Sequence, residues 1–179
     1  TKDGCIRPET SLKSMSGLKP AFDKDGVVTA ATSSPLTDGA AAVIVCSEDY
    51  ANKNSLEILA HIRGMAISGC SPEIMGIGPV LSSQKALKRA GIKLEDVDVI
   101  EMNEAFAAQS LACVKELGVE MSKLNIHGGA ISMGHPLGAS GARITGKAAS
   151  LLKETGKRYA LSTMCVGGGQ GCATVLERV

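Results

Sequence analysis

From residue 58 onward, short apolar segments alternate with longer segments that carry a helical spacing of apolar residues. Strands are predicted at 58–67, 97–102, 130–133, 159–164 and 174–176. Helices are predicted at 79–90, 104–117 and 140–153, because a glycine follows the first two directly and the third closely, at 91, 118 and 156. This alternation predicts an α/β fold in which helices cover a sheet.

The first 57 residues have a different character. Residues 1–36 are rich in Ser, Thr, Pro and Lys, which predicts loops, a short helix and a strand near 27–31. Residues 40–46 form a continuous run of small apolar residues that suits a strand buried on both faces. We therefore divide the chain into segments 1–36, 37–57 and 58–179.

Composition excludes several classes of function. The chain has 179 residues, of which 44% are hydrophobic and 21% charged, the balance of a globular protein. No run approaches the roughly 20 apolar residues that cross a membrane. A net charge of +1 and only two Phe and two Tyr provide neither a basic surface nor stacking platforms. We expect neither a membrane nor a nucleic acid as partner.

The six cysteines include no Cys-x-x-Cys pair, and most stand in apolar segments. We expect buried thiols in a reducing compartment, the cytoplasm. The sequence starts with Thr1 and not with a methionine, so an organelle signal is left open. His127, His135, Cys165 and Cys172 fit none of the common zinc spacings, so no metal site is expected.

Two glycine-rich segments suggest nucleotide binding at first sight. Residues 141–147 match the first seven positions of a phosphate-binding loop, but Ala148 stands where Ser or Thr must contact Mg²⁺. These residues also lie inside a predicted helix. Residues 167–172 lack the third glycine of the dinucleotide fingerprint. A nucleotide-binding protein therefore ranks behind the two functions considered below.

Asn103 and His135 stand in unusual local settings. Asn103 follows a predicted strand directly, and it is either a helix N-cap or an amide that holds a water or an oxyanion. His135 is placed between a glycine and Pro136, which favours an extended, rigidly held residue and indicates chemistry more than packing. We assign structural or surface roles to His61 and His127.

Cys165 follows the strand 159–164 and precedes three glycines, whose N–H groups can bind an anion. A thiol beside a histidine can act as an acid, a base or a nucleophile. We therefore predict that Cys165 and His135 converge on one cavity, together with Asn103.

Three blocks together resemble the thiolases, acetyl-CoA C-acetyltransferase and 3-ketoacyl-CoA thiolase. They are Asn-Glu-Ala-Phe at 103–106, Gly-His-Pro at 134–136 and Cys-Val-Gly-Gly-Gly at 165–169. Blocks at 18–22, 38–42 and 74–79 extend the resemblance over nearly the whole chain. It implies the layered α-β-α-β-α thiolase fold in truncated form. Segment 1–36 would end the CoA-binding loop domain, 37–57 would be the last strand and helix of the N-terminal domain, and 58–179 the C-terminal domain.

The resemblance also implies an acetyl-CoA C-acyltransferase activity, with acetoacetyl-CoA formation by Claisen condensation or the reverse thiolysis. His135 would activate the nucleophile and help bind the thioester oxygen, and Asn103 would hold a water in that oxyanion site. Cys165 would move the α-proton, and the Gly167 N–H would donate to the oxyanion of the acyl-enzyme. No cofactor is implied besides the CoA thioester, which is the substrate.

Further residues match positions that contact the substrate in the family. Ser34 would contact pantetheine. The CoA channel would be lined by Arg7, Ser14, Leu18, Phe22 and Ala30. Met75 and Phe106 would border the acyl pocket.

In the family, the nucleophilic cysteine lies in a Cys-Gly-Ser-Gly-like block of an N-terminal half, and this sequence has no such block. We therefore expect that the chain alone does not perform thiolysis. Its expected partner is a second copy, in a dimer or tetramer, or a chain that carries the N-terminal half. The alternative is a non-catalytic acyl-CoA-binding or assembly fragment.

Overall fold

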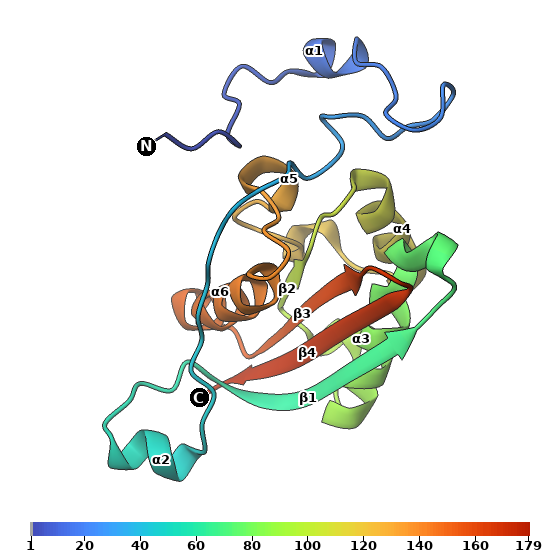
Figure 1. Ribbon diagram of the computed structural model, residues 1–179. Coiled ribbons are helices and arrows are strands. Elements are labelled where there is room, and N and C mark those ends of the chain that lie inside the picture. Colours follow the sequence, from blue (N-terminus) through green and yellow to red (C-terminus); the bar gives the residue numbers. More distant parts are fainter. Residues whose placement is uncertain (1) are drawn as a thin grey trace.

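The computed structural model describes residues 2–179 and contains a four-stranded sheet with helices on both faces (Figure 1). The strands are β1 (Ala60–Gly69), β2 (Val99–Met102), β3 (Tyr159–Val166) and β4 (Gln170–Arg178). Their order is β1-β4-β3-β2, in which only β2 and β3 are parallel. The predicted α/β class, with helices that cover a sheet, is confirmed.

Six α-helices accompany the sheet in the described residues: α1 (Leu12–Ser16), α2 (Glu48–Lys53), α3 (Gly78–Ala90), α4 (Ala107–Leu117), α5 (Ala130–Met133) and α6 (Ser140–Thr155). Short 3-10 segments lie at Pro72–Ile77, Leu94–Asp96 and Met121–Lys123. Gly91, Gly118 and Gly156 end α3, α4 and α6 with φ of 69°, 74° and 68°. These glycine stops were predicted, and the positive φ explains them, since a side chain is strained there.

The sheet separates two apolar cores. On one face, residues of α3 and α4 pack against Ile100 and Met102 of β2. On the other face, Leu151 of α6 packs in one cluster with Val99. Successive residues of a strand point to opposite faces, so Glu101 of β2 points to the α6 face, as Val99 does.

The strand predicted at 27–31 is wrong, because these residues form turns. The Thr32 hydroxyl accepts from the Thr29 N–H at 2.8 Å, and the Thr29 hydroxyl accepts from the Ala31 N–H at 3.2 Å. Such local side-chain hydrogen bonds compete with strand pairing.

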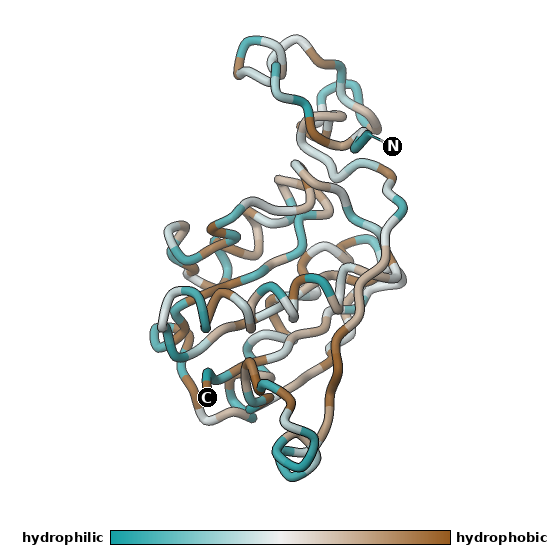
Figure 2. Tube along the Cα trace, turned by 90° about the vertical axis from the view of Figure 1, so that its left-hand side faces the viewer, coloured by the Kyte–Doolittle hydropathy of each residue, from teal (hydrophilic) through white to brown (hydrophobic). Residues whose placement is uncertain are grey.

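The strand predicted at 40–46 is also wrong. Between the N-terminal arm and α2 the chain runs past α6 (Figure 1) and pairs with no strand of residues 2–179. A methyl group of Val43 lies 3.2 Å from where a Gly146 side chain would begin. The apolar side chains at 43, 44 and 45 are 46%, 81% and 71% exposed. Figure 2 shows this segment in brown, as a hydrophobic stretch of the chain.

The segment 130–133, predicted as a strand, is the single-turn helix α5. The Glu104 carboxylate accepts from the Ile131 N–H at 3.1 Å, which stabilises a helix start. Asn103 is not a helix cap, because α4 begins at Ala107 and the Asn103 N–H instead donates to the carbonyl of Thr163 at 2.9 Å. The last strand is longer than predicted, since β4 pairs with β3 up to the turn at 167–169.

Residues 2–36 form an arm above one end of the sheet (Figure 1). Two backbone hydrogen bonds attach it, from the Ser34 N–H to Ala105 at 3.0 Å and from Ala107 to Thr32 at 2.8 Å. The Phe22 ring also meets the Phe106 ring edge-on, at a centroid distance of 6.3 Å. The arm is thereby held to the start of α4, next to the Asn103 block.

Candidate active site

Asn103 and Cys165 lie at the same end of two neighbouring strands. Met102, the last residue of β2, is opposite Thr163 of β3, and the Asn103 N–H continues the pairing to the Thr163 carbonyl. Cys165 is two residues further along β3. Because β2 and β3 are parallel, the carboxyl ends of both strands carry these side chains to one edge of the sheet.

His135 is placed in the turn between α5 and α6, at this end of the sheet. Its Nδ1 lies 2.6 Å from the Ser140 Oγ at the start of α6, and its backbone N–H donates to the Thr37 Oγ1 at 3.1 Å. The next helix residue, Gly141, leaves space in which a Cβ would lie 3.8 Å from the Met164 sulfur. The helix turn that holds His135 therefore packs on β3 one residue before Cys165.

The backbone around His135 depends on the glycine before it. Gly134 has a φ of 100°, and a Cβ there would lie 2.5 Å from side-chain atoms of Thr37. Segment 37–39 therefore packs closely on the Gly-His-Pro turn and fixes its conformation.

The Asn103 side chain is 1% exposed, and neither its oxygen nor its nitrogen has a hydrogen-bond partner within residues 2–179. A buried amide without partners costs about 1–3 kcal/mol, so native structures usually supply one. A water or a substrate atom is a partner of the right chemistry, and this supports the oxyanion interpretation of Asn103.

Burial shifts both titratable groups of the site. Burial, together with the positive charge of Arg143, lowers the pKa of His135, so the ring is neutral at neutral pH. Burial raises the pKa of the Cys165 thiol to about 11, and the nearby thiols of Cys113 and Cys172 add to this. The structure thus holds a neutral imidazole and a protonated thiol.

Glu101 is a buried acid that the sequence analysis missed. It is 3% exposed, and its Oε1 has no hydrogen-bond partner in the described chain. Burial raises the pKa of Glu101 to about 7, although Lys147 and Arg143 on α6 oppose this. Those two residues and Leu151 are spaced by four along α6, on the helix face that covers β2. The sequence feature that could have indicated this buried acid is a glutamate inside the mostly apolar segment 97–102.

Glu104 and Asn125 were also missed, and they tie the loop before His135 to β2. The Asn125 side chain accepts from the Met102 N–H and donates to the Met102 carbonyl, both at 2.9 Å. It also donates to Glu104 at 2.8 Å. Gly129 lies against the Glu104 carboxylate, where a Cβ would have no room. The only sequence feature that could have indicated this contact is the pair of glycines at 128–129, shortly after Asn125.

The residues predicted to bind substrate are only partly gathered. Phe22 contacts Phe106, and the Ser34 hydroxyl donates to the Ala105 carbonyl at 3.2 Å. Met75 is half-buried in the turn before α3. Arg7 lines an open hollow of about 560 Å³ with segment 35–38. Ser14 lies inside α1, where its hydroxyl accepts from the N–H of the capping residue Ser11, whereas Leu18 and Ala30 lie exposed on the arm.

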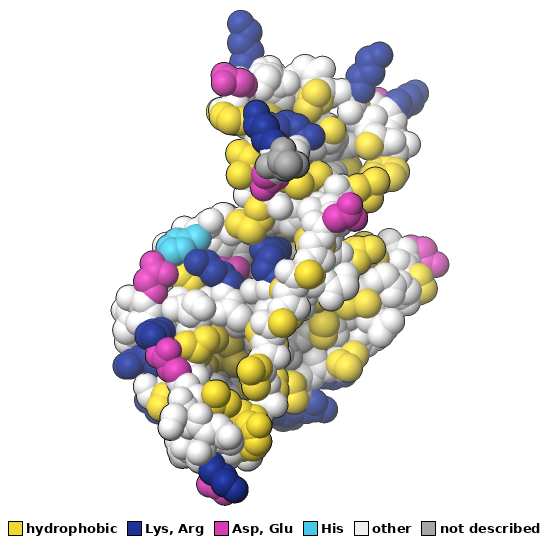
Figure 3. All heavy atoms as spheres, turned by 60° about the vertical axis from the view of Figure 1, so that its left-hand side comes forward, with side chains coloured by type: hydrophobic (Ala, Val, Ile, Leu, Met, Phe, Trp, Pro, Cys, Tyr) yellow, Lys and Arg dark blue, Asp and Glu magenta, His cyan; other side chains and the backbone are white. Residues whose placement is uncertain are grey.

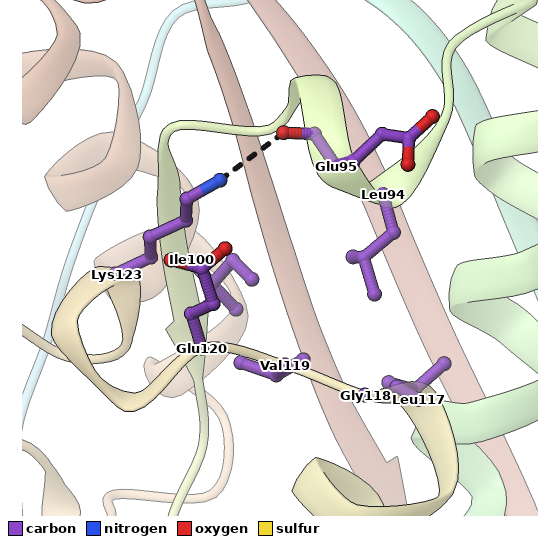
Figure 4. A pocket seen from close by; sticks show the side chains of 8 residues that line it. All are labelled: Leu94, Glu95, Ile100, Leu117, Gly118, Val119, Glu120 and Lys123. Atoms are coloured by element: carbon purple, nitrogen blue, oxygen red, sulfur yellow. Dashed lines mark hydrogen bonds between the residues drawn. The ribbon is translucent and has the colours of Figure 1, made fainter.

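A second hollow, of about 230 Å³, lies beside β2 and contains none of the predicted site residues (Figure 4). The Lys123 ammonium donates to the Glu95 carbonyl at its rim, at 3.1 Å. The residues that line it are Leu94, Glu95, Ile100, Leu117, Gly118, Val119, Glu120 and Lys123.

The two other histidines lie beside carboxylates near the surface. His61 pairs with Glu48 at 3.5 Å, and His127 lies between Lys147 at 2.7 Å and Glu154 at 3.5 Å. Within residues 2–179, no three His, Cys, Asp or Glu side chains are grouped to hold a metal ion. In the same residues, every helix is too short or too polar to span a bilayer.

Comparison with known proteins assigns a family to this fold and site. Residues 56–178 match the family model described as "Thiolase, C-terminal domain", and residues 1–49 match "Thiolase, N-terminal domain". The chain belongs to the thiolase family. The resemblance inferred from the three sequence blocks is confirmed.

The relatives that match include 3-ketoacyl-CoA thiolases. That of Vibrio parahaemolyticus is 57% identical over 180 residues, which cover 98% of this chain and 46% of the relative. That of Aliivibrio fischeri is 54% identical over 182 residues, 99% of this chain and 47% of the relative. The chain spans about half the length of these relatives.

Solved structures agree with this assignment. Human mitochondrial 3-ketoacyl-CoA thiolase matches with a TM-score of 0.96 and 48% identity, over 99% of this chain and 45% of that one. The human enzyme has also been solved in complex with CoA. The acetyl-CoA acetyltransferase of Bacillus anthracis matches with a TM-score of 0.96 and 44% identity, over the same shares of the two chains. The thiolase fold is therefore shown for this chain.

Proposed function

We propose that this chain supplies the acid–base half of a thiolase active site, for condensation of acetyl-CoA with an acyl-CoA or the reverse thiolysis. The observation that carries the proposal is the buried side-chain amide of Asn103, which has no partner within residues 2–179 and lies beside the β3 end that bears Cys165. An enolate needs hydrogen-bond donors where its charge develops and a proton carrier beside the α-carbon.

Each residue has one proposed role in this chemistry. His135 and a water on Asn103 bind the thioester oxygen, and His135 also activates the nucleophile. In the thiolysis direction the Cys165 thiol gives its proton to the α-carbon of the departing enolate. In the condensation direction the Cys165 thiolate takes the proton back. The N–H of Gly167, in the turn between β3 and β4, donates to the second oxyanion.

Coenzyme A is the proposed ligand of the arm, and no separate cofactor is proposed. The complex of the human relative with CoA supports this. Ser34 would contact pantetheine, while Met75 and Phe106 would border the acyl group. The channel would be lined by Arg7, Ser14, Leu18, Phe22 and Ala30. The contact of Phe22 with Phe106 supports a channel that ends near Asn103.

The nucleophile must come from outside these 179 residues, since no Cys-Gly-Ser-Gly-like block is present. We infer that a chain with the N-terminal half supplies the nucleophile, and a second copy, in a dimer or tetramer, is the other expected partner. The exposed apolar side chains of 43–45 support such a partner. Figure 3 shows hydrophobic side chains gathered along the surface below the arm.

A chimera tests the proposal. The part of the Vibrio parahaemolyticus thiolase that precedes its matched region is joined to residues 1–179, and thiolysis of acetoacetyl-CoA is measured. We expect turnover by the chimera and none by the chain alone. Cys165→Ala should lower the rate by about 10²–10⁴-fold, the usual contribution of a proton carrier. Cys46→Ala, which removes an exposed thiol outside the sheet, is the control and should keep the rate.

Two outcomes would contradict the proposal. The first is turnover by the chain alone at the rate of the chimera. The second is an unchanged rate in the Cys165→Ala chimera. A folded chimera that binds CoA but turns over no substrate would favour the non-catalytic acyl-CoA-binding fragment.

A further inference from the structure

Ser140, the first residue of α6, makes the only side-chain hydrogen bond recorded for the His135 ring within residues 2–179. Its Oγ lies 2.6 Å from the ring Nδ1, and the serine is fully buried. The same oxygen lies 3.1 Å from the carbonyl of Pro136. A serine hydroxyl has a single proton, so it donates to one of these two acceptors at a time.

The Pro136 carbonyl already has two donors. The backbone N–H groups of Ala139 and Ser140 both donate to it at 2.9 Å. A carbonyl oxygen has two lone pairs, so these donors occupy it, and a third donor is crowded. The ring Nδ1 is closer to the hydroxyl and has no competing donor in the described residues. The hydroxyl proton therefore belongs on Nδ1.

The charge state of the ring then fixes its tautomer. The neutral imidazole carries one N–H, and an Nδ1 that accepts from Ser140 cannot also carry it. The proton must be on Nε2. The ring thus presents an N–H donor at the end of the sheet where Asn103 and Cys165 lie.

We propose that Ser140 is a positioning residue that holds neutral His135 as the Nε2–H tautomer. The tautomer itself follows from the contacts of Ser140. Its use, donation to a thioester oxygen on which negative charge develops, rests on the proposed function. The opposite tautomer would direct a lone pair at that oxygen and repel it.

The second contact of the hydroxyl gives His135 an alternative state. When the hydroxyl turns to the Pro136 carbonyl, its oxygen accepts from an Nδ1–H, and Nε2 carries the lone pair of a base. Activation of a nucleophile through Nε2 requires this arrangement. Rotation of the hydroxyl alone does not make His135 a base, because a proton must also leave Nε2 and another must bind Nδ1.

Nitrogen NMR of the histidine rings in the full 179-residue chain tests the proposal. The chain has only three histidines, so His61→Gln and His127→Gln variants assign the third signal. Above the pKa of the ring, we expect the Nε2–H tautomer for His135 in the native chain. Ser140→Ala should give a mixture of tautomers, and Ser140→Thr, which keeps the hydroxyl, should restore Nε2–H.

Ser162→Ala is the matched control. Ser162 lies on β3 and is 3% exposed, and its hydroxyl bonds the hydroxyl of Thr145 on α6 at 3.0 Å, away from any histidine. This variant should leave the His135 tautomer unchanged. A native Nδ1–H tautomer would overturn the proposal, and so would an unchanged tautomer in folded Ser140→Ala. If Ser140→Ala does not fold, the native tautomer alone decides.

Kinetics of the chimera separate this proposal from the proposed function. Ser140→Ala should lower kcat, by no more than the about 10²-fold that loss of an oxyanion donor costs, with little change in KM. If the native chimera has no activity while the tautomer is as expected, the function falls and the tautomer assignment stands.

Discussion

Replacement of Glu101 by glutamine should make the chain more stable at high pH. The raised pKa of Glu101, about 7 against its usual 4.5, means that the folded chain favours the neutral carboxyl. A tenfold change in proton affinity corresponds to about 1.4 kcal/mol, so ionisation of the folded state costs about 3 kcal/mol. Glutamine has the same shape and never ionises.

The sign of the pH dependence follows from the same values. Because the folded pKa is above the unfolded one, stability is fully present below about pH 4.5 and is lost as the pH rises through 7. Glu101→Gln avoids this loss. Its gain in the free energy of unfolding should be under about 1 kcal/mol at pH 5 and about 3 kcal/mol at pH 9.

Denaturant unfolding of the full chain at both pH values, followed by circular dichroism, measures this gain. Glu116→Gln is the control, since Glu116 is exposed on α4 and makes no salt bridge in the described residues. The control should change stability equally at both pH values. The raised pKa of Glu101 would be refuted if Glu101→Gln gave no gain in the free energy of unfolding at pH 9, or the same gain at pH 5 and pH 9.

Three further results are expected. Gly169→Ala should lower the free energy of unfolding by at least about 1–2 kcal/mol, because the φ of Gly169 is 87° and a Cβ would collide with a backbone carbonyl. Gly167 has open space around it, so Gly167→Ala should leave the free energy of unfolding unchanged in the same denaturation experiment. Iodoacetamide at pH 8 should label exposed Cys46 first and spare Cys165 until unfolding, as read by mass spectrometry; early labelling of Cys165 would show that its thiol is neither buried nor protonated. Asn103→Ala should lower kcat of the chimera by about 10²–10³-fold but change stability by under about 1 kcal/mol, because its side-chain amide makes no hydrogen bond within residues 2–179. A large stability loss without a rate effect would assign it to the fold.

Much of the fold was predictable because the deciding physics is local. Gly91, Gly118 and Gly156 end helices through their own backbone freedom, and Pro79 starts α3 at a position that proline favours. The strand ends that carry Asn103 and Cys165 were predictable for the same reason. Apolar residues stop there, and polar or glycine residues follow.

The errors have a common physical cause, which is dependence on a distant partner. Residues 40–46 are apolar enough for a strand, but strand pairing needs a neighbour that residues 2–179 do not place there. Residues 130–133 are too few for periodicity to separate strand from helix, and the Glu104 carboxylate decides in favour of a helix. The Asn103 side chain could cap a helix, but the backbone continues the pairing of β2 with β3.

The chemistry of the site was predictable in its residue types and not in its charge states. His135 and Cys165 stood out by the glycines around them. The neutral state of His135 depends on burial and on Arg143, one turn into a helix that packs on the sheet. The tautomer depends on Ser140, whose importance is visible only once the helix start faces the ring.

The central claim is that Cys165 carries the α-proton. The most direct test is deuterium exchange into the methyl group of acetyl-CoA in D2O, followed by proton NMR, in a chimera whose nucleophilic cysteine is replaced by alanine. The account predicts exchange with Cys165 present and only background exchange in the Cys165→Ala chimera. Equal exchange rates with and without Cys165 would contradict it.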